Sequence, residues 1–277
     1  MGGLLYFLIY YLSMVTINFG VPWMRQPERL VQLVESLNSG QSNRKIDYTY
    51  FRPADLEFGK SVDVLRELAK SNIGLYLTTS ARSGVDSIQK TLEGLLSGGV
   101  LPDKLIVDSH SLINVAENKI VNEYDISLYA SAIMGIKGNN YEKLIQLKKT
   151  HPNIDAVCLH HDAIFDRNLK DYTKLLREEG IEPILLANES CFRGCPYRED
   201  HYEHLALKHP NLPDNYQNLC LSVRNKNPAT LKSISGFIHP DLLEKISEQT
   251  EITHFKITSM PSRRRGRPQE ESERTIL

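Results

Sequence analysis

The sequence predicts an α/β protein, specifically a (β/α)8 TIM-type barrel built as a single domain. Eight short runs rich in Val, Ile, Leu, Tyr and Thr alternate along the chain with amphipathic segments. This alternation is typical of buried parallel strands that are joined by helices. No GxGxxG motif follows the first run, so a doubly wound open sheet is the less favoured alternative.

The elements can be assigned in order from these runs and from turn residues at their ends. The predicted strands are residues 15–22, 45–53, 73–81, 104–110, 125–133, 155–161, 182–190 and 253–259. The predicted helices are residues 27–40, 61–72, 86–99, 140–152, 168–180 and 239–249. In the second helix Val62, Leu65 and Leu68 share one face. The third helix opens with Asp86 as its N-cap and closes on a glycine pair.

The two ends of the chain do not follow this pattern. Residues 1–13 are apolar, but the run is shorter than the roughly 20 residues of a membrane-spanning helix. We expect a poorly anchored extension, with a membrane-surface anchor as the alternative. Residues 260–277 lack apolar periodicity and are expected to be a disordered, solvated tail, with contact between the RRRGR run and nucleic acid as the less favoured alternative. The barrel domain is then residues 14–259, with an insertion at about 191–237.

Charge and cysteine content restrict the location and the partners. The formal net charge of -1 argues against general polyanion binding. Four cysteines in 277 residues do not form a secreted disulfide scaffold, so a reducing, cytoplasmic location is predicted. In that environment clustered cysteines more often bind metal or take part in redox chemistry. No stable membrane insertion is expected.

Polar residues at the C-terminal ends of the strands should face the mouth of the barrel, where barrel enzymes keep their active sites. These residues are Trp23, Arg52, Ser80, Arg82, Asp108, His110, Ser131, His160, His161, Asp162, Asn188, Glu189 and Lys256. A purely structural barrel would not need so many ionisable groups at one end. For Asp108 and Asp162, a role as the N-cap of the following helix is an equally good interpretation.

Two of the cysteines lie together in NESCFRGCPYREDHYEH, residues 188–204, here called the cysteine segment. Cys191 and Cys195 are spaced C-x3-C, which is neither the usual C-x2-C zinc knuckle nor the C-x2-C redox motif. Gly194 permits a tight turn between them. A helix is predicted to follow, on which Arg198 and His201 would share a face.

The other two cysteines could complete a metal site. Cys220 lies downstream in the insertion, and Cys158 lies in the sixth strand, on the same side as His160. Cysteine ligands suit an iron–sulfur cluster or zinc. For Cys158 alone a buried strand cysteine is the slightly favoured interpretation, and a disulfide between Cys191 and Cys195 is disfavoured. The favoured interpretation is a metal site that uses at least Cys191, Cys195 and Cys220.

These residues resemble the collagenase-like peptidases of peptidase family U-32. NESCFRGCPYREDHY after an apolar strand is similar to the cysteine region of that family. Cys220, LKSISGFIHPDLLEK and THFKITS resemble its later landmarks, and EYDISLYASAIMGIKG and VDAVCLHHD resemble its fifth and sixth strands. The resemblance covers most of residues 15–259 and is most specific at residues 188–201.

The resemblance implies a TIM-type barrel and, despite the peptidase label, a cysteine-bound [4Fe–4S] cluster. Characterised branches of the family look like oxygen-independent hydroxylation systems for quinone precursors and RNA bases. By matching motif, Cys191, Cys195 and Cys220 would be ligands, with Cys158 as the candidate fourth. In the family the F-K-I strand usually continues into a glycine–arginine pair and more helical sequence. Here it passes into MPSRRRGRP, which raises the alternative of a barrel that is incomplete at its C-terminus.

The first hypothesis is therefore an iron–sulfur barrel enzyme for redox modification of a small aromatic or RNA-base substrate, with a partner protein or electron donor. Cations at the mouth could hold an anionic group, and a carboxylate or histidine could move a proton. The candidate catalytic residues are Glu189, His160, Arg198 and Lys256, and the candidate substrate-binding residues are Arg52, Asp108, His201 and Asn188.

Two other function classes stay open. A peptidase or other hydrolase acting on peptides is one, although the sequence contains neither HExxH nor GxSxG. A cysteine nucleophile paired with His160 or His201 is conceivable, but it leaves the other cysteines unexplained. The second alternative is a non-catalytic partner subunit stabilised by a cluster or, as the lesser alternative, by zinc.

Overall fold

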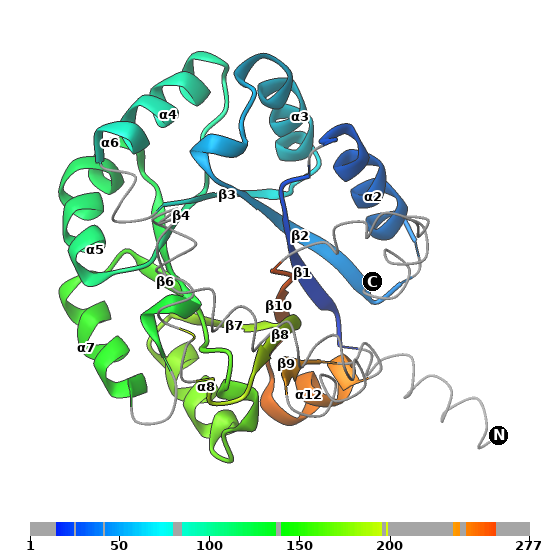
Figure 1. The fold of residues 1–277 in the computed structure, drawn as a ribbon, viewed down its shortest axis with the longest axis vertical. Helices are drawn as coiled ribbons and strands as arrows, with labels where there is room; N and C mark the ends of the chain where they lie inside the picture. Colours follow the sequence, from blue (N-terminus) through cyan, green and yellow to red (C-terminus); the bar gives the residue numbers. More distant parts are fainter. Residues whose placement is uncertain are drawn as a thin grey trace, which may run out of the picture.

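The chain forms a closed barrel of eight parallel strands surrounded by helices (Figure 1). This computed structural model describes residues 15–24, 26–40, 42–79, 85–136, 140–195, 198, 235–238 and 242–258. The strand order around the barrel is β1-β10-β7-β6-β5-β4-β3-β2. The predicted TIM-type barrel is confirmed. The sheet is also closed at its C-terminal strand, because β10, which contains Phe255 and Lys256 of the FKI motif, pairs in parallel with β1 and β7.

Each barrel strand lies within or close to a predicted apolar run. The barrel strands are β1 (Ile17–Pro22), β2 (Arg44–Phe51), β3 (Gly74–Thr78), β4 (Lys104–Val107), β5 (Ser127–Ala130), β6 (Ile154–Cys158), β7 (Glu182–Leu186) and β10 (His254–Lys256). Most are buried on both faces, because one face packs against the helices and the other fills the barrel interior.

The helices pack outside the strands, as Figure 1 shows. The α-helices are α2 (Glu28–Asn38), α3 (Phe58–Lys70), α4 (Val85–Ser97), α5 (His110–Ala116), α6 (Asn122–Tyr124), α7 (Tyr141–Thr150), α8 (Leu169–Glu178) and α12 (Leu243–Thr250). Short 3-10 turns form η1 (Pro53–Asp55), η3 (Ala132–Met134) and η5 (Ala163–Phe165), and η2 (Glu117–Val121) is a π-helix. The six predicted helices are confirmed, and the α5–η2–α6 region is an addition to them.

Two helix starts differ from the prediction. Ser109, not Asp108, caps α5, because its side chain accepts a hydrogen bond from the Leu112 N–H. Asp86 lies inside the first turn of α4, which begins at Val85, so its assignment as N-cap is wrong. The expected face of α3 is confirmed, since Val62, Leu65 and Leu68 are all buried.

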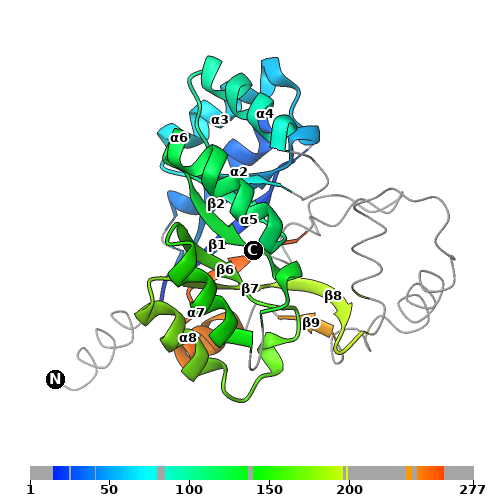
Figure 2. The same ribbon diagram turned by 90° about the vertical axis from the view of Figure 1, so that its left-hand side faces the viewer.

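The predicted seventh strand is divided in two. β7 ends at Leu186, and β8 (Asn188–Phe192) pairs in antiparallel fashion with β9 (Ser235–Phe237) in a separate two-stranded sheet beside the barrel (Figure 2). The break is at Ala187, whose N–H still donates to the Lys256 carbonyl of the barrel. The carbonyl of Ala187 accepts instead from the Ile238 N–H. The backbone therefore leaves the barrel at the point where the cysteine segment begins.

Charged side chains gather at the N-terminal end of the barrel. His254 Nδ1 lies 3.2 Å from a Glu182 carboxylate oxygen, and His254 Nε2 lies 3.6 Å from an oxygen of Asp47. Lys104 forms an ion pair with Asp155 in the same region. These ion pairs join side chains of neighbouring strands across the N-terminal end of the barrel. The candidate functional residues lie at the opposite, C-terminal end of the barrel. No helix within the described ranges is both long and apolar enough to cross a membrane.

Candidate functional site

The barrel interior holds a cluster of three tyrosines. The rings of Tyr48 and Tyr76 stack with centroids 4.1 Å apart, and Tyr129 presents its edge to them at 6.3 and 5.9 Å. Gly20 on β1 makes room for this arrangement, because a Cβ there would lie 1.9 Å from the Tyr48 ring. Sequence reasoning missed this cluster, although tyrosines recur in the second, third and fifth predicted strands and signal it.

The phenols of this cluster stay protonated. Burial raises the pKa of Tyr48 and of Tyr129 well above the ordinary value of a tyrosine. The two hydroxyls are 3.5 Å apart, and the Tyr129 hydroxyl also forms a hydrogen bond with the thiol of Cys158. The interior above the floor therefore offers neutral hydroxyl groups and one buried thiol.

Lys256 is a buried lysine beside this tyrosine cluster. It is the last residue of β10 and is only 8% exposed. Its Nζ lies 4.2 Å from the centroid of the Tyr50 ring and 5.4 Å from that of Tyr129. Within the part of the chain that the structure describes, no carboxylate pairs with it. Burial lowers the pKa of Lys256, and the nearby Cys158 opposes that effect in part.

Replacing Lys256 with methionine is expected to raise the free energy of unfolding at about pH 7 by about 1–4 kcal/mol, the range for apolar replacement of buried ionic groups. The folded-state pKa lies below that of the unfolded chain, about 10.4, so the unfolded chain binds more protons between the two values. The stability of the wild type therefore rises with pH between the two pKa values. The stability advantage of Lys256→Met over the wild type should shrink across the same pH range. Denaturant titrations across this range measure it.

Lys174→Met is the matched control, because the Lys174 side chain is 70% exposed. Its stability difference from the wild type should be small and independent of pH. A Lys256→Met protein that is less stable than the wild type, by a constant amount at every pH, would contradict the assignment of an unpaired buried amine.

A buried ion pair fastens the cysteine segment to the end of β6. Both guanidinium NH2 groups of Arg198, which is 5% exposed, donate to the two carboxylate oxygens of Asp162 at 3.1 Å. The Gly194 N–H also donates to Asp162, at 3.1 Å. Burial alone would raise the pKa of Asp162, but the hydrogen bonds and charge of Arg198 outweigh it and lower that pKa. Asp162 thus binds the turn that carries Cys195.

His160 belongs to the same network. Its Nε2 lies 3.2 Å from an Arg198 guanidinium nitrogen, and its Nδ1 lies 3.1 Å from the Asp162 backbone nitrogen. A neutral imidazole has one acceptor nitrogen, so the ring accepts from only one of these donors at a time. The structure therefore brings the predicted site residues His160, Asp162 and Arg198 together.

Other predicted residues lie apart from this network. The Arg52 side chain is 69% exposed and pairs with Asp55 at 2.7 Å across η1. Ser131 caps η3 by accepting from the Ile133 N–H at 3.5 Å. Asp108 follows β4 at the same end of the barrel. Arg52 is thus engaged in a local ion pair at the surface.

The cysteines are only partly covered by the structure. Cys158 is fully buried in the interior and Cys195 is half-buried, and both are thiols outside any disulfide. Cys191 lies on β8, but its side chain and those of Asn188 and Glu189 lie outside what is described. Four predicted site residues lie outside the described ranges: Ser80, Arg82, His201 and Cys220. Among the described residues, no three His, Cys, Asp or Glu side chains converge as a metal site.

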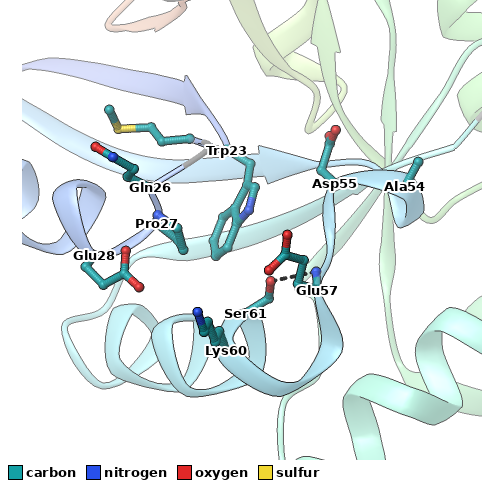
Figure 3. A pocket seen from close by; sticks show the side chains of 10 residues that line it. Trp23, Gln26, Pro27, Glu28, Ala54, Asp55, Glu57, Lys60 and Ser61 are labelled. Atoms are coloured by element: carbon teal, nitrogen blue, oxygen red, sulfur yellow. Dashed lines mark hydrogen bonds between the residues drawn. The ribbon is translucent and has the colours of Figure 1, made fainter.

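A recess lies at the same end of the barrel, between the loops that follow β1 and β2 (Figure 3). Its volume is about 580 Å³. Trp23 forms one wall, and its indole packs edge-on against Phe51 at 5.9 Å. Glu28, Glu57 and Lys60 also line it. Trp23 lies directly after β1 at the C-terminal end of the barrel, as predicted. The charged residues of the helices beside it were not predicted.

The strand order and these side chains define a (β/α)8-barrel protein whose candidate site lies at the C-terminal mouth, the end at which the strands' carboxyl termini lie. No protein-family model matches the chain, and no curated protein is significantly similar to it in sequence. Among solved structures, a variant of the citrate synthase SbnG is 11% identical with a TM-score of 0.40, covering 79% of this chain and 97% of that one.

Two further solved structures show the same low level of similarity. A conserved Enterococcus faecalis protein with an unknown function is 14% identical, with a TM-score of 0.37, over 66% of this chain and 54% of that one. The dimeric archaeal Rubisco from Hyperthermus butylicus is 13% identical, with a TM-score of 0.39, over 85% of this chain and 63% of that one. The fold assignment rests on the closed strand order itself.

Proposed function

We propose that this chain is an iron–sulfur barrel enzyme of the peptidase U-32 type, with a [4Fe–4S] cluster bound by Cys191, Cys195 and Cys220 at the C-terminal mouth. Its reaction would be the redox modification, of hydroxylation type, of a small aromatic or RNA-base substrate. The observation that carries the proposal is the attachment of the cysteine segment to the mouth through Asp162.

The attachment holds Cys195 at the end of the barrel where barrel enzymes keep their chemistry. Gly194 and Arg198 flank Cys195 on either side, and both bind the carboxylate of Asp162 just beyond β6. Gly194 has φ of +61°, a left-handed conformation that favours glycine and turns its N–H toward that carboxylate. Asp162 and Arg198 are therefore positioning residues in this proposal. They hold the cysteine-bearing turn against the end of the neighbouring strand.

The thiols differ in how well they fit as ligands. Cys195 is half-buried at the mouth, and soft thiolate donors of this kind suit an iron–sulfur cluster, which would supply one-electron transfer when bound. Cys158 is fully buried, and its thiol is hydrogen-bonded to Tyr129, which fits a ligand less well. A cluster with three cysteine ligands would keep one iron open to substrate.

The position of the Tyr50 ring favours a planar substrate. Tyr50 is partly exposed and lies over Lys256 at the upper end of the interior. Its hydroxyl donates to the Ile257 carbonyl, and it lies 3.1 Å from the carbonyl of Thr258, so the ring is held in place. A fixed aromatic face favours stacking of an aromatic ring or a base.

Anaerobic purification should yield a brown protein with iron and sulfide in equal amounts, about four of each per chain. The Cys191→Ser, Cys195→Ser double variant should lose both, because it removes two of the proposed thiolate ligands. Iron and sulfide assays with an absorbance spectrum measure this. Cys158→Ser is the matched control and is expected to retain the cluster, since this thiol is enclosed by the barrel.

A colourless protein that carries zinc would contradict the proposal. So would a double variant that retains its full iron and sulfide content. If Cys158→Ser and the double variant both lose iron, the protein still binds a cluster, and Cys158 is its fourth ligand.

A further inference from the structure

We propose that Lys256 is a nucleophilic amine that forms an imine with a small aldehyde or ketone at the C-terminal mouth of the barrel. The inference goes beyond the proposed function, because it requires neither the cluster nor redox chemistry. The proposed ligand is a carbonyl compound. It rests on the position of one side chain and on the groups that surround it.

The position of Lys256 suits a reacting group. It ends β10, which lies between β1 and β7 in the closed sheet (Figure 1). The residue is only 8% exposed. Its Nζ lies 4.2 Å from the centroid of the Tyr50 ring and 5.4 Å from the centroid of the Tyr129 ring. Since β10 is a rigid strand paired on both sides, the amine is held at a fixed place.

The surroundings of Lys256 favour an uncharged amine. The described residues place no carboxylate beside it, and the buried phenols of Tyr48 and Tyr129 are kept protonated by burial. Cys158 is the acidic group that acts on the lysine, and it only partly offsets the effect of burial, which lowers the lysine pKa. A desolvated, uncharged amine is the form that attacks a carbonyl.

The reaction is balanced without an oxidant or reductant. The lone pair of Nζ attacks the carbonyl carbon, the C–N bond forms as the C=O π bond breaks, and a proton from solvent converts the oxygen to a hydroxyl group. Loss of one water molecule then gives the imine, which carries a proton on nitrogen as an iminium ion. The rings of Tyr50 and Tyr129 would lie beside the bound carbon skeleton and pack against it.

The test is reductive trapping of the full chain with benzaldehyde and sodium cyanoborohydride near neutral pH, followed by peptide mass spectrometry. The expected result is benzylation of Lys256 roughly tenfold or more faster than of Lys174, because a lower pKa gives more free amine. The Lys174 side chain is 70% exposed and serves as the internal control. The rate at Lys256 should also level off at a lower pH than the rate at Lys174.

Lys256→Arg and Lys256→Met separate loss of the amine from loss of the fold. Both should melt cooperatively and lack the fast adduct. The Cys191→Ser, Cys195→Ser variant should still label at Lys256, so that failure of the cluster proposal and failure of this one are distinguishable. The inference is overturned if Lys256 in the wild type labels no faster than Lys174, or if its rate follows the same pH profile.

Discussion

Replacing Asp162 with asparagine is expected to lower the free energy of unfolding by about 3–5 kcal/mol, because it leaves Arg198 buried without its counter-charge. Arg198 is 5% exposed, and two nitrogens of its guanidinium group donate to this carboxylate. The amide of Gly194 should exchange faster with solvent in the variant, since its acceptor is the same carboxylate. Chemical denaturation and hydrogen exchange of the peptide around Gly194 measure the two effects.

The pH dependence of the free energy of unfolding gives a second test of the Asp162–Arg198 ion pair. The pKa of Asp162 is lower in the folded state than in the unfolded chain. Its contribution to stability is therefore complete above about pH 4, the ordinary range of an aspartate, and is lost as pH falls through the lower folded-state value. The Asp162→Asn variant should lack this acid-dependent loss. Wild type and variant should thus converge in stability at low pH.

Glu178→Gln is the matched control. Glu178 pairs with Lys174 at 3.8 Å, but both side chains are largely exposed, at 59% and 70%. Removing such a surface pair should cost no more than about 0.5 kcal/mol. If Asp162→Asn cost as little as Glu178→Gln, the ion pair would not anchor the cysteine segment. The proposed role of Asp162 as a positioning residue would then fail.

Replacing Gly20 with alanine is expected to destabilise the protein by about 3 kcal/mol, at the upper end of overpacking effects in protein cores. The added Cβ would lie 1.9 Å from the Tyr48 ring. The ring cannot move aside, because Tyr76 stacks on it at 4.1 Å and Tyr129 abuts it. Thermal and denaturant unfolding of the variant measure the loss.

A double-mutant cycle with Tyr48→Ala tests the cause. In that background the Gly20→Ala change should cost less than about 1 kcal/mol, because the space that the ring occupied is free. Gly59→Ala is the control: a Cβ at Gly59 in α3 meets no atom within 4 Å, so it should stabilise by up to about 1 kcal/mol. Equal losses for Gly20→Ala in both backgrounds would show that the Tyr48 ring is not the obstacle.

The two proposals concern neighbouring parts of the mouth. The Asp162–Arg198 pair holds the cysteine segment over the end of β6. Lys256 lies on β10, with Cys158 of β6 acting on it. A variant that loses the first can therefore keep the second. Measuring imine trapping at Lys256 in Asp162→Asn would establish whether the segment also controls access to the amine.

Much of the fold could be predicted from the sequence, because apolar runs alternating with amphipathic helices have few other solutions. The eight barrel strands and the six assigned helices follow from local pattern. The errors are local as well. Ser109 rather than Asp108 caps α5, because adjacent capping residues compete for the same position. The run 182–190 divides at Ala187, because its second half finds a partner strand outside the barrel.

The candidate site could be predicted as a location but not as a set of contacts. Lys256, His160, Asp162 and Arg198 were all assigned to the mouth region from their positions after or near strands. Their interactions differ from one another, however. Arg198 pairs with Asp162, whereas Lys256 lies against the aromatic rings of Tyr50 and Tyr129. Pairing across 36 residues depends on how loops pack, and no local pattern records it.

The sequence by itself determined the parallel barrel, the end at which polar groups gather and the clustering of cysteines after the seventh strand, because these follow from periodicity and from the direction of parallel strands. Only the tertiary structure decided that Gly20 accommodates the Tyr48 ring and that Lys256 lies buried between Tyr50 and Tyr129. The physical reason is that burial and charge pairing are properties of neighbours in space. Those neighbours come from strands far apart along the chain.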